Sequence, residues 1–375
     1  MAAEARAAAP RIRHRAALDA IDPYVPGLAP VGPPDRALKL ASNENPFGPS
    51  PLAVAAARAA VEGVDRYPEP GAGALRARLA DRHGVSPGQI LVGAGSDEIF
   101  HLLTRAYCEP GRRAVMARPP YGIHRIAAQS TGAEVVLVPL RNHVHDLAAM
   151  AAAAAPLATV FVANPHNPTG TTVRPEELRD FVERLPADCL VVIDEAYHEY
   201  VEPAHRAAAI DLLALHPGLV VTRTFSKIYG LAGLRVGYAI ASAEILEPVE
   251  RIRPPFNVSS PALAAAAAAL DDVDHVAATL RGTEISLAAL VAACERLGLA
   301  HVPSQANFVL VEDRDGWPAA LAADGITVRP GANLGMPGWA RVSLARPDEM
   351  HRVIEIMERA VRQRHDLADR ASSGR

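Results

Sequence analysis

The segment Val220–Gly237, with the sequence VVTRTFSKIYGLAGLRVG, runs from a short apolar stretch into hydroxyls, a lysine and glycines. Residues 219–221 predict a buried strand, and the polar residues after it predict a site at the end of that strand. Lysine is scarce in this arginine-rich chain, because Lys39 is the only other one. A lysine is usually a solvated surface charge, but one kept among small residues at a strand end suits Schiff-base chemistry. We therefore expect Lys227 to be reactive.

Five further apolar runs precede this segment and also predict strands. They cover residues 90–92, 114–117, 135–139, 159–162 and 190–193. Helical stretches at about 51–62, 74–83, 99–107 and 148–155 lie among them. Short, uniformly apolar strands alternating with helices predict an α/β fold with a mainly parallel sheet that is covered on both faces.

Polar side chains follow three of these strands. Asn167 comes after the run 159–162, Asp194 and Tyr197 come after the run 190–193, and Lys227 follows residues 219–221. Because ligands of such sheets bind at the carboxyl ends of the strands, we expect these side chains to meet in one cleft.

The run 90–92 ends in glycines, just before the helix predicted near residue 99. Free backbone N–H groups at Gly95 and Ser96, together with the helix dipole, would attract an anion. The same sequence permits Ser96 and Asp97 to be simple helix caps. Tyr121 follows the strand 114–117, where a core position and stacking on a ligand ring fit equally well.

These residue types together suit pyridoxal phosphate. The cofactor needs a lysine, a carboxylate at the ring nitrogen, donors at the ring oxygen and an anion cradle. Asp194 can supply the carboxylate, and Asn167 and Tyr197 the donors. The cradle can be formed by Gly95, Ser96, Thr224, Ser226 and Arg235.

Composition limits the remaining possibilities. The chain has 375 residues, is 50% apolar and carries a formal charge of −4, which predicts two domains and small-molecule partners, not nucleic acid. No apolar run approaches the ~20 residues that span a bilayer. The three cysteines lack metal-ligand spacing, so we expect no metal and a reducing, cytoplasmic setting.

The predicted architecture has four parts. They are an arm over residues 1–34, a large domain over 35–253, a small α+β domain over 254–363 and a disordered tail over 364–375. The polar cluster at 40–49 fits either a helix N-terminus or an arm that lines the site. Two predicted strands, 325–330 and 340–344, place Arg329 and Arg341 at the mouth of the small domain.

From about residue 21 to 357 the chain resembles the fold-type I pyridoxal-phosphate aminotransferases, and among them the histidinol-phosphate aminotransferase family. The matching motifs occur in order along the chain: 43–46 (NENP), 66–68 (RYP), 95–98 (GSDE), 167–170 (NPTG), 194–197 (DEAY), 226–227 (SK), 233–237 (GLRVG) and 341–343 (RVS). Any one motif could occur by chance, whereas the ordered set is specific.

The resemblance implies a three-layer large domain and a role for each matched residue. Lys227 would form the internal aldimine of a ping-pong transamination and shuttle the proton, Asp194 would pair with the pyridinium, and Tyr121 would stack on it. Asn167 and Tyr197 would bind the ring oxygen. The phosphate would be held by Ala94, Gly95, Ser96, Ser226 and Arg235, with Tyr67 reaching it from the partner of a homodimer.

For the substrates, the resemblance implies glutamate or 2-oxoglutarate and histidinol phosphate. Arg341 would clamp a carboxylate, Arg329 would help with the substrate phosphate, and Tyr24 and Asn43 would close over the substrate.

Departures from the family pattern leave substrate choice open. Ala94 replaces the usual Asn, although backbone N–H groups remain; His124 replaces an aromatic residue; and residues 345–349 read ARPDE. An aromatic amino-acid aminotransferase and a lyase or decarboxylase of the same fold are the alternatives. A further alternative is a transcription regulator or a binding module that keeps the cofactor without turnover, but no basic patch supports this alternative.

Overall fold

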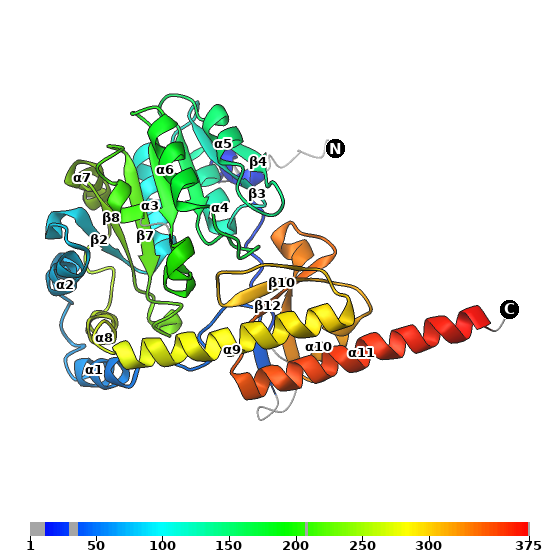
Figure 1. Cartoon of the computed structure of the whole chain (residues 1–375). Coiled ribbons are helices and arrows are strands. Elements are labelled where there is room, and N and C mark those ends of the chain that lie inside the picture. Colours follow the sequence, from blue (N-terminus) through cyan, green and yellow to red (C-terminus); the bar gives the residue numbers. More distant parts are fainter. Residues whose placement is uncertain (1–11, 30–36, 207–208, 374–375) are drawn as a thin grey trace, which may run out of the picture.

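The computed structural model describes residues 12–29, 37–206 and 209–373, the side chains of 365–373 excepted. Both ends of the predicted arm, including its boundary at residue 34, lie outside the described residues. Two sheets organise the described part (Figure 1), with seven and five strands.

The larger sheet has the strand order β2-β8-β7-β6-β5-β3-β4. β3 to β7 are mutually parallel, and β8 runs antiparallel to both β2 and β7. The predicted runs all form strands: β2 Ile90–Gly93, β3 Arg113–Arg118, β4 Glu134–Pro139, β5 Thr159–Ala163, β6 Leu190–Asp194 and β7 Leu219–Thr224, followed by β8 Gly237–Ala241.

Helices cover both faces of this sheet. The pleat of β5 turns Val160 and Val162 toward α5 and α6, and Phe161 toward α3, α4 and α7. Burying one such side chain contributes about 2 kcal/mol, so the two faces hold β5 firmly in place. The bounds are α1 Pro51–Val61, α2 Gly73–His83, α3 Ser96–Tyr107, α4 Gly122–Thr131, α5 Leu147–Ala153, α6 Pro175–Arg184, α7 Ala243–Ile252 and α8 Ser260–Ala269.

The smaller sheet has the order β1-β11-β12-β10-β9 and is antiparallel except for the β1–β11 pair. Its strands are β1 Leu38–Leu40, β9 His301–Val302, β10 Phe308–Glu312, β11 Ile326–Pro330 and β12 Trp339–Ser343. Residues 38–40 thus join the smaller sheet, although the predicted large domain begins at residue 35. The division into domains stays a prediction.

Three helices complete this part: α9 Val273–Leu297, α10 Trp317–Ala323 and α11 Pro347–Ser373. α9 (yellow in Figure 1) runs from the neighbourhood of α1 and α8 to the smaller sheet and packs beside α11. α11 reaches Ser373, so the tail expected to be disordered from residue 364 is helical to that residue. The Arg, Leu and Ala residues of this segment favour helix.

One helix bears on the expectation that no apolar run spans a bilayer. By length and composition alone, α9 could cross a bilayer. α9 is this apolar because it is rich in alanine. Its residues Leu290, Ala293 and Cys294 pack in the core beneath the smaller sheet, as those of a core helix in a globular protein do.

Candidate active site

A cavity of about 240 Å³ lies at the carboxyl ends of β5, β6 and β7, where the smaller sheet meets the larger one. Twelve of the predicted site residues line it, from eight separate parts of the chain. They are Tyr24, Asn43, Ser96, Tyr121, Asn167, Asp194, Tyr197, Thr224, Ser226, Lys227, Arg235 and Arg341. The expected convergence of strand ends is therefore found.

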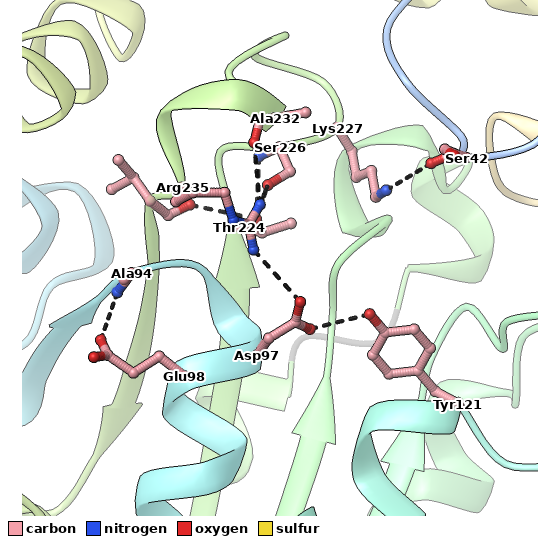
Figure 2. A network of polar contacts seen from close by, with 11 residues as sticks. Ser42, Ala94, Asp97, Glu98, Tyr121, Thr224, Ser226, Lys227, Ala232 and Arg235 are labelled. Atoms are coloured by element: carbon pink, nitrogen blue, oxygen red, sulfur yellow. Dashed lines mark hydrogen bonds and ion pairs between the residues drawn. The ribbon is translucent and has the colours of Figure 1, made fainter. Parts of the chain in front are cut away.

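Lys227 lies just beyond β7, half-buried at the wall of the cavity. Its Nζ donates to the Ser42 carbonyl oxygen at 3.3 Å and lies 5.6 Å from the centroid of the Tyr197 ring (Figure 2 shows the first contact). No carboxylate forms an ion pair with this amine among the described residues. Because a single hydrogen bond to a backbone oxygen holds this amine, the amine is free to attack the carbonyl carbon of a ligand, as Schiff-base formation requires.

Two consecutive acids lie at the end of β6, Asp194 as its last residue and Glu195 directly after it, and their surroundings differ. Glu195 is fully buried and paired with Arg223, whose Nη2 lies 2.8 Å away. Burial raises the pKa of Glu195, but the Arg223 charge opposes it and leaves that pKa below its ordinary value. Asp194 instead lines the cavity, 5% exposed. It is the carboxylate that a bound ligand can reach.

Both carboxylate oxygens of Asp194 contact neighbouring protein groups. Its Oδ1 accepts the Ala196 backbone N–H at 3.1 Å, and Nε2 of His124 lies 3.2 Å from its Oδ2. His124 is buried and stacks on Phe161, with ring centroids 4.8 Å apart. This departure from the family pattern therefore places an imidazole directly against the candidate cofactor carboxylate.

The two donors expected at a ring oxygen are each held by a neighbouring side chain. Asn43 donates from Nδ2 to the Tyr197 hydroxyl at 2.8 Å, which leaves that hydroxyl proton for a ligand. Arg341 donates from Nη1 to Asn167 Oδ1 at 2.6 Å, which leaves the Asn167 amide as a donor. Asn43 has φ +56°, a left-handed conformation that asparagine tolerates, and Ser343 bonds both its N–H and its Oδ1.

Arg341 itself is buried, and its Nη2 donates to the Ala41 carbonyl oxygen at 2.9 Å. Its Nε is buried without a hydrogen-bond partner within the described ranges. Burial lowers the pKa of Arg341, and the nearby charge of Arg329 lowers it further. Both facts favour an anionic ligand beside this guanidinium.

Another part of the cavity wall carries the residues expected to form the anion cradle (Figure 2). Arg235 Nη1 lies 3.4 Å from Ser226 Oγ, and the Thr224 hydroxyl donates to Ser226 Oγ at 2.9 Å. Gly95 packs against this guanidinium so closely that a Cβ would lie 2.4 Å from Arg235 Nη2. Gly95 also has φ +82°, which glycine adopts at little cost.

The N-terminus of α3 decides between the two expectations for this loop. Gly95 is the N-cap, while Ser96 and Asp97 lie in the first turn, so neither is a side-chain cap. The Ala94 N–H, expected to be available to a phosphate, donates instead to Glu98 Oε2 at 2.6 Å. Ala94 and Gly95 are not among the lining residues of the cavity.

Asp97 is a site residue that the sequence analysis considered only as a cap. Its Oδ1 accepts the Tyr121 hydroxyl at 3.0 Å and its Oδ2 lies 3.4 Å from Arg235 Nη2. Burial and the Asp97 charge raise the pKa of Tyr121 well above its ordinary value. Tyr121 lines the cavity, and its ring meets Phe100 and His124 edge to face.

Two further expected residues, besides Ala94 and Gly95, lie outside this cavity. Tyr67 is 81% exposed, stacks on Phe256 with centroids 4.7 Å apart, and does not line the cavity of its own chain. Arg329 lines an adjoining cavity of about 260 Å³, which shares Tyr24, Tyr121, Asn167 and Arg341 with the first. Its guanidinium donates to the Val25 carbonyl oxygen and lies 5.8 Å from the centroid of the Tyr24 ring.

The donor set fits pyridoxal phosphate. A lysine amine, a reachable carboxylate, two ring-oxygen donors and an Arg–Ser cradle at a helix N-terminus surround one cavity. The close approach of Gly95 to Arg235 and the partnerless Nε of Arg341 are features that bound anions would explain.

Comparison with known proteins gives the same class. Residues 35–356 match the model of the aminotransferase class I and II family, and the chain belongs to that family. It is a pyridoxal-phosphate-dependent aminotransferase, as the sequence predicted, with an amino donor and a 2-oxo acid as its substrates.

Among the relatives, histidinol-phosphate aminotransferase 1 of Dechloromonas aromatica is 44% identical over 91% of this chain and 97% of its own. Histidinol-phosphate aminotransferase of Symbiobacterium thermophilum is 46% identical over 92% and 98%. The structure of histidinol-phosphate aminotransferase from Sinorhizobium meliloti in complex with pyridoxal-5'-phosphate is similar with a TM-score of 0.84. It is 29% identical, over 95% of this chain and 99% of that one. The fold-type I architecture is thereby confirmed.

Proposed function

We propose that this enzyme transfers an amino group between glutamate and the oxo form of L-histidinol phosphate, in histidine biosynthesis. The observation that carries the proposal is the name and identity of its relatives, which are 44% and 46% identical over more than nine-tenths of the chain. The arrangement of the two arginines supports it, because Arg341 and Arg329 line joined cavities that could take two anionic groups.

Pyridoxal phosphate, when bound, carries the amino group between the two substrates and draws electrons from the substrate α-carbon. We assign Lys227 Nζ as the group that removes and returns the α-proton, and Asp194 as the carboxylate that holds a proton at the ring nitrogen. Asn167 and Tyr197 would orient the ring through its oxygen. Ser226 and Arg235 would fix the phosphate end.

The half-reactions test this proposal. Purified enzyme, loaded with cofactor, is mixed separately with histidinol phosphate, phenylalanine and glutamate, and conversion to the amine form of the cofactor is followed by absorbance. We expect fast conversion with histidinol phosphate and glutamate. A preference for phenylalanine would make the protein an aromatic aminotransferase. Release of carbon dioxide without a 2-oxo product would make it a decarboxylase.

We further propose a cytoplasmic homodimer in which Tyr67 completes the cavity of the partner. The exposed ring of Tyr67 and its absence from its own cavity support this arrangement. The three cysteines are buried and unpaired, which suits a reducing compartment. Tyr67→Phe subunits mixed with Lys227→Ala subunits would form one native site per heterodimer. Mixtures no more active than either parent would refute the shared site.

A further inference from the structure

The cavity of about 260 Å³ beside the cofactor cavity has an unusual balance of charge. It is enclosed by the arm at Asp22–Val25, by the start of α4 and by the turn Gly331–Leu334. Three guanidiniums line it, those of Arg125, Arg329 and Arg341, against the single carboxylate of Asp22. A ligand there would be anionic.

Two of these arginines are already partly bonded. Arg341 donates to Asn167 and to the Ala41 carbonyl oxygen, and Arg329 donates to the Val25 carbonyl oxygen. Arg125 differs from both. In the described part of the chain its side chain forms no hydrogen bond and no ion pair, even with Asp22, and its Nε is buried without a partner.

Local structure explains how Arg125 comes to face this cavity. α4 begins at Gly122, so Arg125 lies in its first turn, directly after His124. His124 turns inward against Asp194, and the ~100° rotation to the next helical position carries Arg125 away from it. Gly122, Arg125 and Ile126 then line the cavity of about 260 Å³, while Tyr121 lines both this cavity and the cofactor cavity.

We propose that Arg125 determines specificity by binding, together with Arg329, the phosphate monoester of the substrate. This inference rests on the proposed function and assigns a second cation to its phosphate end. A phosphate monoester carries close to two negative charges and three acceptor oxygens at neutral pH. One guanidinium fork satisfies two oxygens and one charge, so two are needed. Arg341 then remains for a carboxylate.

Arg125→Gln tests the assignment, with Arg125→Lys as a variant that keeps the charge but loses the fork. Arg105→Gln is the matched control, because Arg105 is exposed on α3 and lines neither cavity. The cofactor-loaded enzymes are compared by the ratio of kcat/KM for histidinol phosphate to that for glutamate. We expect Arg125→Gln to lower this ratio about ten- to hundredfold, mainly through KM. Arg125→Lys should lower it less, and Arg105→Gln should leave it unchanged.

Inorganic phosphate gives a second measurement that does not need histidinol phosphate. Against the glutamate half-reaction of the loaded enzyme, its inhibition constant should rise about tenfold in Arg125→Gln and stay constant in Arg105→Gln. An inhibition constant and a ratio that are both unchanged in Arg125→Gln, with native circular dichroism, would overturn the role of Arg125. If wild-type enzyme converts glutamate but not histidinol phosphate, the proposed function fails. The phosphate measurement then still decides whether Arg125 binds an anion.

Discussion

The buried imidazole of His145 links the stability of this enzyme to pH. Its Nε2 donates to the Ala163 carbonyl oxygen at 2.9 Å, at the end of β5, and its Nδ1 is buried without a partner in the described structure. A proton added to Nδ1 would place an unpaired charged donor in the interior. Burial accordingly lowers the pKa of His145 from 6.5 to about 4.

The sign and size of the effect follow from linkage. Because the pKa is lower in the folded state, the unfolded chain takes up the proton first as the pH falls. The stability contributed by neutral His145 is thus complete above pH 6.5 and is lost as the pH falls from 6.5 to about 4. The full loss is about 3 kcal/mol, of which about 2 kcal/mol has gone at pH 5.

Urea unfolding at pH 7.5 and pH 5.0, at one protein concentration, measures this loss. His145→Gln keeps an N–H for Ala163 but does not titrate, so its loss between the two pH values should be smaller than that of wild type by about 2 kcal/mol. His351→Gln removes an exposed imidazole on α11 and should behave as wild type. Equal losses in wild type and His145→Gln would refute the reasoning.

Three further changes test the site itself. Lys227→Ala should abolish turnover and the visible absorbance of lysine-bound cofactor without changing the urea midpoint; an unchanged spectrum would remove Lys227 from its role. His124→Phe keeps the ring beside Phe161 but removes the contact with Asp194, so kcat should fall about three- to tenfold, and unchanged kcat would show that the 3.2 Å contact is incidental. Gly95→Ala forces the Arg235 guanidinium away and strains the backbone at φ +82°. The dissociation constant of the cofactor should therefore rise about tenfold. Unaltered affinity would show that Gly95 has no role in binding the phosphate.

Local pattern was sufficient for much of the fold and the site. Each uniformly apolar run became a strand of the larger sheet, because a run of three to five apolar residues between turns has few other ways to bury itself. The parallel direction of those strands put Asn167, Asp194 and Lys227 at one edge. The sequence alone could therefore predict that these three residues line one cavity.

Contacts between distant segments could not be predicted in this way. Periodicity along one segment carries no information about its partner, so neither the antiparallel β8 nor the pairing of β1 with β11 was foreseen. Only the tertiary structure showed that Asp97 forms an ion pair with Arg235 and that the Ala94 N–H is hydrogen-bonded to Glu98.

The sequence by itself determined the chemistry of this enzyme, because the reactive residue types stand at strand ends whose positions follow from apolar runs. The tertiary structure decided which of those groups are already bonded and which remain for a ligand. Arg341 meets Asn167 across 174 residues of chain, whereas Arg125, four residues after Tyr121, has no partner within the described ranges. Whether a charged group has a partner depends on how distant elements pack together, and a local sequence pattern does not contain that information.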